Sequence, residues 1–319
     1  MQIQLNHDTV VLYHKNCLDG LGAAWVAWKA FDKKVDLIAV QYGNKFEEMF
    51  GESFSNLIGK TVYCLDFSFD RETVKHLAGI CTLILLDHHN TAAVALKGIA
   101  GTDINGFPEA WNTRLTPDQS IIVVDERYSG AMLAWMWFFE DVPPFGIRCV
   151  QDRDLWRWKI KGSREWTSVA FSHEKTVENF DMLINTDPFT VIAEGTGLMR
   201  VQKNNVATVS KSARRFVLDG IDVPIINCNS FLVSDVGDLL GQDEHFVATY
   251  IDTQHGRQFS LRSRHKDAEI NKLAERFGGG GHPQAAGFQI DFDDERFGMS
   301  HVYLESEYYQ RFTGELGKV

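Results

Sequence analysis

Short apolar runs alternate with helix-like segments along the first half of the chain. The runs TVVLY, TVYCL and CTLILL occupy residues 9–13, 61–65 and 81–86, and helical patterns at 21–31 and 71–79 follow the first two runs. Apolar runs this short, bounded by polar turn residues, indicate buried strands. Strands that alternate with helices predict βαβ units, in which right-handed crossovers build a parallel sheet with helices on both faces.

The pattern changes after the middle of the chain. From Thr190 to Leu218 there is no proline and no clear stop signal, so this stretch predicts a long connecting helix. Beyond Gly220 the spacing predicts mixed elements: a strand at 223–228, a short helix at 234–240, a hairpin over 246–264 that turns at His255 and Gly256, and a helix at 267–277.

These elements predict an α/β fold with two domains. We expect a parallel-sheet domain over residues 1–189, a helical linker over 190–220 and a smaller α+β domain over 221–319. A chain of 319 residues is long enough for each domain to bury a core of its own.

Composition narrows the classes of function. The chain is 44% hydrophobic and 24% charged, as ordinary folded domains are, and no segment has the uninterrupted apolar length that a bilayer requires. The opening MQIQLNHDTV lacks the basic start and apolar core of a signal peptide, so we expect a cytoplasmic enzyme without a membrane partner. The net charge of −11 argues against binding to long duplex nucleic acid but permits a short phosphorylated substrate.

Candidate chemistry lies at the ends of the predicted strands. Each of the three apolar runs is followed by side chains that bind metals or transfer protons: His14 and Asp19, then Asp66, then Asp87, His88 and His89. Because parallel strands end at the same edge of a sheet, we expect these side chains to converge. A lone strand-end aspartate is usually a turn or helix cap, but its recurrence at successive strands favours a site. Mixed carboxylate and imidazole ligands suit Mn²⁺ or a similar divalent ion, and two ions sharing a carboxylate could clamp a phosphate.

The order of the motifs resembles a known family. The stretches HKNCLDG, YCLDF, LLDHHN, YSGAMLAW, VQDRDLW and GGGGHPQAAGF follow one another along nearly the whole chain. In this order they resemble the DHH phosphoesterase superfamily, in the form with a C-terminal DHH-associated domain that includes nanoRNases and RecJ-like phosphodiesterases. The DHH motif alone is weak, whereas the ordered set ending in the glycine-rich histidine motif is specific.

The resemblance implies a role for each matching residue. Five residues would bind metal: His14, Asp19, Asp66, His88 and Asp152. Asp66 would bridge two ions, and Asp154 is the alternative to Asp152 as the fourth-motif ligand. Asp87 would orient His88, while His89 would contact the substrate phosphate or transfer a proton.

The first motif departs from the family pattern at Cys17. Many relatives carry NDLDG there, whereas this chain has Asn16-Cys17-Leu18-Asp19-Gly20. A thiolate here could bind a softer ion, or the thiol could be a bystander beside a weak site, so the centre would hold one or two ions. The other cysteines form no CxxC pair and are expected to be small buried residues: Cys64, Cys81, Cys149 and Cys228.

The C-terminal motif and the preceding hairpin supply candidate phosphate ligands. Consecutive glycines let backbone N–H groups approach a phosphate, which makes Gly280 and Gly281 candidates, with His282 as a further donor. By resemblance this segment is a substrate-binding loop that faces the metal centre across an interdomain cleft. Arg262 is the candidate phosphate clamp, and Arg264 is its competitor.

These features predict a Mn²⁺-dependent hydrolase of short nucleotides. The first hypothesis is a nanoRNase-like phosphodiesterase that cleaves dinucleotides such as pGpG, or short RNA, to mononucleotides. The alternatives are a phosphomonoesterase that acts on nucleotides such as pAp, and a non-catalytic nucleotide sensor, which Cys17 makes conceivable. The sequence does not decide whether the substrate is RNA or DNA, or from which end it is cleaved. It also does not decide the oligomeric state, for which a homodimer is one possibility. Four tryptophans could stack on nucleobases, although core packing is the simpler expectation for most: Trp135, Trp137, Trp156 and Trp158.

Overall fold

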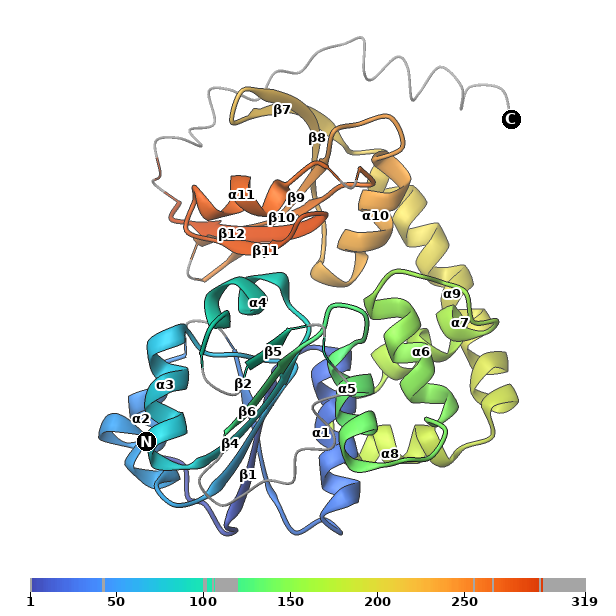
Figure 1. Cartoon of the computed structure of the whole chain (residues 1–319). Helices are drawn as coiled ribbons and strands as arrows, with labels where there is room; N and C mark the ends of the chain where they lie inside the picture. The colour runs from blue at the N-terminus through green and yellow to red at the C-terminus, as the bar shows by residue number, and fades with distance from the viewer. Residues whose placement is uncertain are drawn as a thin grey trace, which may run out of the picture. The chain divides into compact units, whose positions relative to one another are not determined.

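The computed structural model describes residues 2–41, 44–99, 102–104, 106, 120–254, 256–265, 267–292 and 294 of the chain. The chain divides into two compact units, Met1–Met199 and Arg200–Val319 (Figure 1). This division falls inside a helix, and the domain limits expected at 189 and 220 stay predictions.

The first unit is built on a sheet of six strands, all parallel. The three strands predicted from apolar runs are present, which confirms the parallel sheet. Three further strands were missed, although DLIAV and IIVV are also short apolar runs. The order across the sheet is β2 (Asp36–Val40), β1 (Thr9–His14), β3 (Thr61–Leu65), β4 (Thr82–Asp87), β6 (Ile121–Val124) and β5 (Thr102–Ile104).

Alternate residues of each strand pack against opposite layers of helices. In β4, Ile84 and Leu86 enter one buried cluster, while Leu83 and Leu85 enter the other. The helices therefore cover both faces of the sheet, as predicted (Figure 1). The first cluster includes residues of α1 (Leu18–Ala30), α5 (Gly130–Phe138), α6 (Phe145–Asp154), α7 (Ser163–Ser172) and α8 (Val177–Asn185). The second includes residues of α2 (Phe46–Phe50), η1 (Glu52–Leu57), α3 (Arg71–Ile80) and α4 (Asn90–Leu96).

The predicted linker is helical over only part of its length. Helix α9 spans Pro188–Ser210, and the chain then enters strand β7 (Arg214–Leu218). The predicted helix over 190–220 is wrong at its end, because Asp219 and Gly220 form a two-residue turn into β8 (Ile221–Asn227). Both turn residues have positive φ, 53° and 79°, as such a hairpin turn requires. No helix in the described residues is long and apolar enough to cross a membrane.

The second unit is a mixed sheet with helices, which confirms the α+β expectation. Its strand order is β11-β12-β10-β9-β8-β7, and only the β8–β9 pair is parallel among the described strands. The expected hairpin is present as β9 (Val247–Thr253) and β10 (Gly256–Arg262), while His255 of its predicted turn lies outside the described residues. The remaining elements are η3 (Ser230–Leu232), α10 (Val233–Leu240), α11 (Ile270–Glu275), β11 (Gly280–His282) and β12 (Ala285–Ile290).

The glycine-rich motif differs from the loop that was expected. Gly280, Gly281 and His282 form the short strand β11, which pairs with Gly287, Ala286 and Ala285 of β12. Glycine is required at position 281, where φ is 136° and a Cβ would lie 2.5 Å from the carbonyl oxygen of Ala285. The motif is therefore a tight hairpin rather than an open glycine loop.

Candidate metal centre

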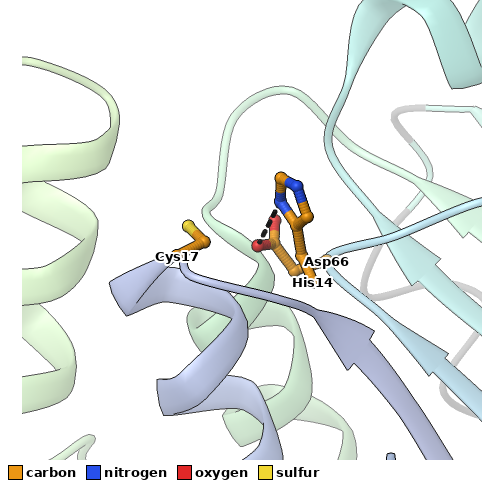
Figure 2. A group of neighbouring side chains, drawn as sticks. All are labelled: His14, Cys17 and Asp66. Atoms are coloured by element: carbon orange, nitrogen blue, oxygen red, sulfur yellow. Dashed lines mark ion pairs between the residues drawn. The ribbon is translucent and has the colours of Figure 1, made fainter. Parts of the chain in front are cut away.

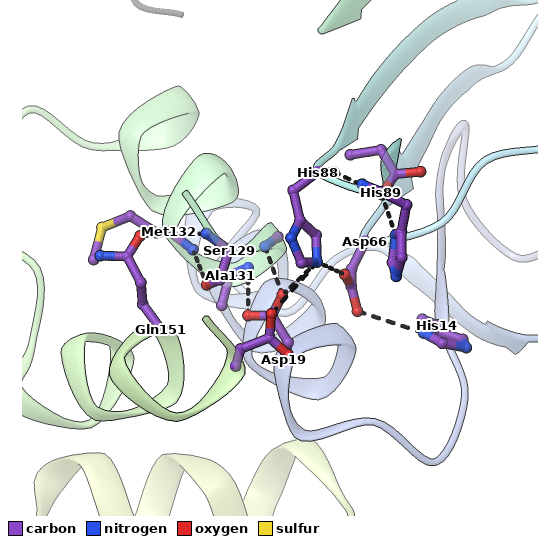
Figure 3. A network of polar contacts seen from close by, with 12 residues as sticks. His14, Asp19, Asp66, His88, His89, Ser129, Ala131, Met132 and Gln151 are labelled. Carbon is purple, nitrogen blue, oxygen red and sulfur yellow. Dashed lines mark hydrogen bonds and ion pairs between the residues drawn. The ribbon is translucent and has the colours of Figure 1, made fainter. Parts of the chain in front are cut away.

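Three neighbouring strands of the first sheet end at one group of polar side chains. Strand β1 ends at His14, β3 is followed by Asp66, and β4 ends at Asp87 beside His88. Asp66 joins the group, because its Oδ2 lies 3.7 Å from His14 Nδ1 and its Oδ1 lies 3.1 Å from His88 Nε2 (Figure 3). The strand ends that are separated in sequence therefore meet in space, as expected for parallel strands.

The backbone at Asp66 is held in an unusual conformation. Its φ is +57°, a region that non-glycine residues rarely adopt, and its side chain is 1% exposed. A Cβ at Gly130, the first residue of α5, would lie 2.5 Å from the Cβ of Asp66. The glycine in YSGAMLAW thus allows α5 to begin directly against Asp66. Strained backbone of this kind is common at functional sites.

Asp19 is anchored by the start of the same helix. Its carboxylate accepts hydrogen bonds from the backbone N–H groups of Gly130 at 2.5 Å and Ala131 at 3.0 Å (Figure 3). The side chain of Ser129 caps α5 by accepting from the N–H of Met132. The positive end of the helix dipole stabilises the Asp19 carboxylate, whose Oδ2 lies 3.7 Å from His88 Nε2.

The structure places Asp154, rather than Asp152, beside His88. The carboxylate of Asp152 accepts hydrogen bonds from the N–H groups of Lys159 and Ile160 and from Ser163 Oγ, at 2.8, 3.0 and 2.6 Å. These donors fix the segment that follows α6. Asp154 instead places Oδ2 3.5 Å from His88 Nε2, and it forms a potential metal-binding group with Asp19 and His88. Asp154 is therefore better positioned than Asp152 to be the fourth-motif ligand, a role that stays a prediction for both.

Asp87 is aimed mainly at His89. Its Oδ1 lies 2.6 Å from His89 Nδ1, and it accepts a hydrogen bond from the backbone N–H of His88 at 2.7 Å. The predicted orienting role of Asp87 therefore applies to the ring of His89, while it reaches His88 through the backbone. Burial would lower the pKa of His89, but Asp87 outweighs burial and raises this pKa to about 9.

Cys17 lies beside His14 and Asp66. The thiol, the imidazole and the carboxylate each offer one ligand atom within 4.8 Å of the others (Figure 2). Burial and the carboxylate of Asp66 raise the pKa of Cys17 well above its usual value, so the isolated group is a neutral thiol. A cation would reverse this preference, because a coordinated thiol loses its proton. Both interpretations of Cys17, ligand and bystander, stay open.

The charges of the cluster favour a bound cation. Burial and the carboxylates of Asp66 and Asp154 raise the pKa of Asp19 well above its usual value. Burial would also raise the pKa of Asp66, but its contacts with His14 and His88 lower it. Asp66 Oδ2 is buried and accepts no hydrogen bond within the described part of the chain. Crowded carboxylates with an unsatisfied buried oxygen fit a divalent cation with oxygen and nitrogen ligands.

The candidate phosphate ligands lie in the second unit. Arg262 ends β10, where its guanidinium donates to Ser234 Oγ at 3.3 Å and to the carbonyl of Leu261 at 2.8 Å. Burial lowers the pKa of Arg262 to about 10. Arg264 is instead paired with Asp238 at 3.5 Å. Because no carboxylate in the described residues pairs with Arg262, its charge is the better placed of the two for an anionic ligand.

Comparisons with known proteins find similar chains at low sequence identity. No protein-family model matches the chain. Protein R106 of Acanthamoeba polyphaga mimivirus is 26% identical over 298 residues, which cover 87% of this chain and 66% of that protein. Oligoribonuclease NrnB of Bacillus subtilis is 24% identical over 308 residues, covering 88% of this chain and 72% of NrnB. The DHH domain of PF0399, a member of a family of ribosomal proteins, superposes with a TM-score of 0.52 at 14% identity, covering 98% of this chain and 87% of that one.

Gly130→Ala tests the close approach of α5 to Asp66. The added Cβ must displace Asp66, so we expect divalent-metal affinity to fall by roughly tenfold or more, which isothermal titration with Mn²⁺ would measure. Gly197→Ala is the matched control, because a Cβ at Gly197 in α9 meets nothing within 4 Å. Unchanged Mn²⁺ affinity in the Gly130 variant would contradict this account of the site.

Two asparagine substitutions, Asp154→Asn and Asp152→Asn, each replace one carboxylate by an amide. We expect the first to affect metal binding and the second to affect the stability of the fold. Burial and Asp66 raise the pKa of Asp154, so its ionised form destabilises the metal-free fold. We expect Asp154→Asn to weaken Mn²⁺ binding without lowering the metal-free unfolding temperature. Asp152→Asn places an amide donor among three donors and should cost roughly 1–3 kcal/mol of unfolding free energy in chemical denaturation. The reverse pattern would restore Asp152 as the ligand.

Proposed function

We propose that the chain is a member of the DHH phosphoesterase superfamily and a metal-dependent phosphodiesterase that hydrolyses short nucleotides to mononucleotides. The observation that carries this proposal is the position of Asp66. Its carboxylate belongs to two potential metal-binding groups, one with His14 and Cys17 and one with His88 and His89. A shared carboxylate is the usual bridge between two ions that act on one phosphate.

The residues present fit a divalent metal. His14 and Asp66 would hold one ion, with Cys17 as a third ligand if its thiol is not a bystander, and Asp19, His88 and Asp154 would complete a second site next to Asp66. Ions bound there would lower the pKa of a water molecule and offset the charge of the scissile phosphate. Oxygen and imidazole donors dominate the set, which supports Mn²⁺ as the ion to test first.

His89 has the geometry of a proton donor. Asp87 holds its Nδ1 at 2.6 Å and favours the protonated ring, so Nε2 is the atom that would donate to a phosphate oxygen or to the leaving oxygen. Asp87 is itself completely buried, so solvent does not screen the interaction of its charge with His89. His89 is therefore proposed as the catalytic acid and Asp87 as the residue that positions it.

The second unit supplies the candidate ligands for the terminal phosphate of the substrate. We propose that Arg262, His282 and the backbone of Gly280 and Gly281 bind the terminal phosphate of the nucleotide. NrnB is an oligoribonuclease, which supports short RNA or a dinucleotide such as pGpG as the substrate class. The net charge of −11 also favours a short ligand over long nucleic acid.

A substrate panel tests the proposed activity. Metal-free protein would be loaded with Mn²⁺, Mg²⁺ or Co²⁺ and incubated with pGpG, short RNA, short DNA, cyclic dinucleotides and pAp, and the products would then be separated. We expect mononucleotides from pGpG and short RNA. Free phosphate from pAp without turnover of dinucleotides would indicate a phosphomonoesterase instead, and binding without any turnover would indicate a nucleotide sensor.

Asp66→Ala and His88→Ala should abolish turnover while the fold persists. Each change removes a group shared by two potential metal-binding sets, so we expect the rate to fall by at least roughly a thousandfold. His76→Ala is a control, because His76 is an exposed histidine bound to the carbonyl of Ser53. Turnover by the Asp66 variant at the wild-type rate would exclude the bridging role.

Cys17→Asp and Cys17→Ser separate the two interpretations of the thiol. If Cys17 only weakens a hard-metal site, the aspartate variant should keep or raise Mn²⁺-dependent turnover, because a carboxylate is a better Mn²⁺ ligand. If the thiolate is a specific ligand, both variants should lose activity, and Co²⁺-loaded wild type alone should show thiolate-to-cobalt absorption. The two readouts together assign the residue.

A further inference from the structure

A strained segment rich in tryptophan and basic residues follows the metal centre. The tryptophan loop, residues 155–162, connects α6 to α7. Trp156 and Trp158 both have a φ of +51°, although the loop contains a glycine only at Gly162. Backbone strain at two bulky residues persists only where the surroundings impose it. The hydrogen bonds to Asp152 from Lys159, Ile160 and Ser163 supply that constraint.

The two tryptophans are not part of the helical core. Trp135 is buried and stacks on Trp25, with ring centroids 6.2 Å apart, so core packing explains that residue. Trp156 is 38% exposed, and its ring meets the ring of Trp158 edge to face at 5.0 Å. The indole Nε1 of Trp158 is buried and donates to no partner in the described residues. The loop thus exposes the ring of Trp156, and beside it the buried N–H of Trp158 has no hydrogen-bond partner in the described residues.

Cations line the same aromatic surface. Arg164 lies 4.0 Å from the ring centroid of Trp158, and Arg153 lies 4.4 Å from that of Phe171. Residues 153–164 contain five basic side chains and one acidic side chain in a chain whose net charge is −11. This concentration of positive charge is therefore local. Aromatic faces interleaved with Arg and Lys are the usual surface for single-stranded nucleotides.

The surface reaches the metal centre at both ends. Asp154, the last residue of α6, contacts His88, and Trp156 follows two residues later. At the other end Lys175 lies 5.5 Å from the ring of Phe171 and donates to the carbonyl of Asn16, the neighbour of Cys17. Helices α6 and α7 run side by side between these points (Figure 1). The tryptophan loop is thus connected to the centre through Asp154 at one end and through Lys175 at the other, which supports a nucleotide whose phosphate lies at the centre and whose base lies on the loop.

We propose that Trp156 is a stacking platform for the nucleobase attached to the scissile phosphate, with Trp158 and Arg164 supporting it. This inference rests on the proposed function for the identity of the ligand. It assigns base recognition to the first unit, whereas Arg262 and His282 would hold a terminal phosphate. Stacking on an indole face accepts every base, so the platform recognises a nucleoside rather than a particular sequence.

Binding in the absence of turnover tests the platform. Calorimetry on the metal-free full chain would compare pGpG with the analogous 5′-phosphorylated sugar–phosphate dimer that lacks both bases. We expect the wild type to bind pGpG more tightly by roughly 5- to 100-fold, the range of base–aromatic stacking. Trp156→Ala should remove most of this difference without changing affinity for the abasic dimer. Trp156→Phe should retain it, because phenylalanine keeps an aromatic face.

The controls keep a folding defect apart from lost stacking. Phe189→Ala removes another exposed aromatic side chain, 80% exposed in α9, and should bind pGpG as the wild type does. Trp156→Leu fills the site without a π face and should behave as Trp156→Ala does. Equal affinity of the wild type for both ligands, binding of neither, or an intact base preference in the alanine and leucine variants would overturn the inference. Base-dependent binding without hydrolysis of any nucleotide would instead overturn the proposed function alone.

Discussion

The centre depends on the two hydrogen bonds that the Asp19 carboxylate accepts from the first amides of α5. They join α1 to α5, two helices that also pack against each other on one face of the sheet. The same contact brings Gly130 against Asp66, and only a residue without a Cβ permits that approach. A helix N-terminus can satisfy the oxygens of a buried carboxyl group because its N–H groups are unpaired within the helix. One capped helix end thereby fixes two of the acidic groups in the cluster.

The parallel sheet and the convergence at its edge were predictable because both follow from local pattern and strand direction. The end of β3 is predictable to the residue, since Asp66 interrupts an apolar run. The missed hairpin between β7 and β8 had a clear signal in Asp219-Gly220, but uninterrupted helical spacing upstream masked it. The choice between Asp152 and Asp154 could not be made from spacing. Residues two apart on a helix point in different directions, and only the packing of α6 decides which one faces the centre.

Conformations that the local sequence pattern does not specify account for the other differences. Nothing near Asp87 in sequence indicates whether its carboxylate turns toward the ring of His88 or that of His89, because both follow it directly. The sequence Leu65-Asp66 at the end of β3 likewise gives no indication that Asp66 has a positive φ. The glycine-rich motif also differs, since the family resemblance implies a loop whereas pairing with Ala285 and Ala286 makes a strand. In the glycine-rich motif, strand pairing outweighed the preference of glycine for loops.

The charges of the first unit couple metal binding to nucleotide binding. Without a cation, the carboxylate of Asp66, whose pKa is lowered by its histidine contacts, would face any phosphate placed at the centre, and like charges at close range repel strongly in a buried site. Positive charge within the cluster comes from His89, whose pKa is raised to about 9, and further positive charge lies beside it at Arg164 and Lys175. A nucleotide can therefore make its base and flanking contacts without metal, while its phosphate at the centre is repelled by Asp66. Cations at the centre remove that repulsion, so metal binding and productive phosphate binding are thermodynamically coupled, and each must strengthen the other by the same factor.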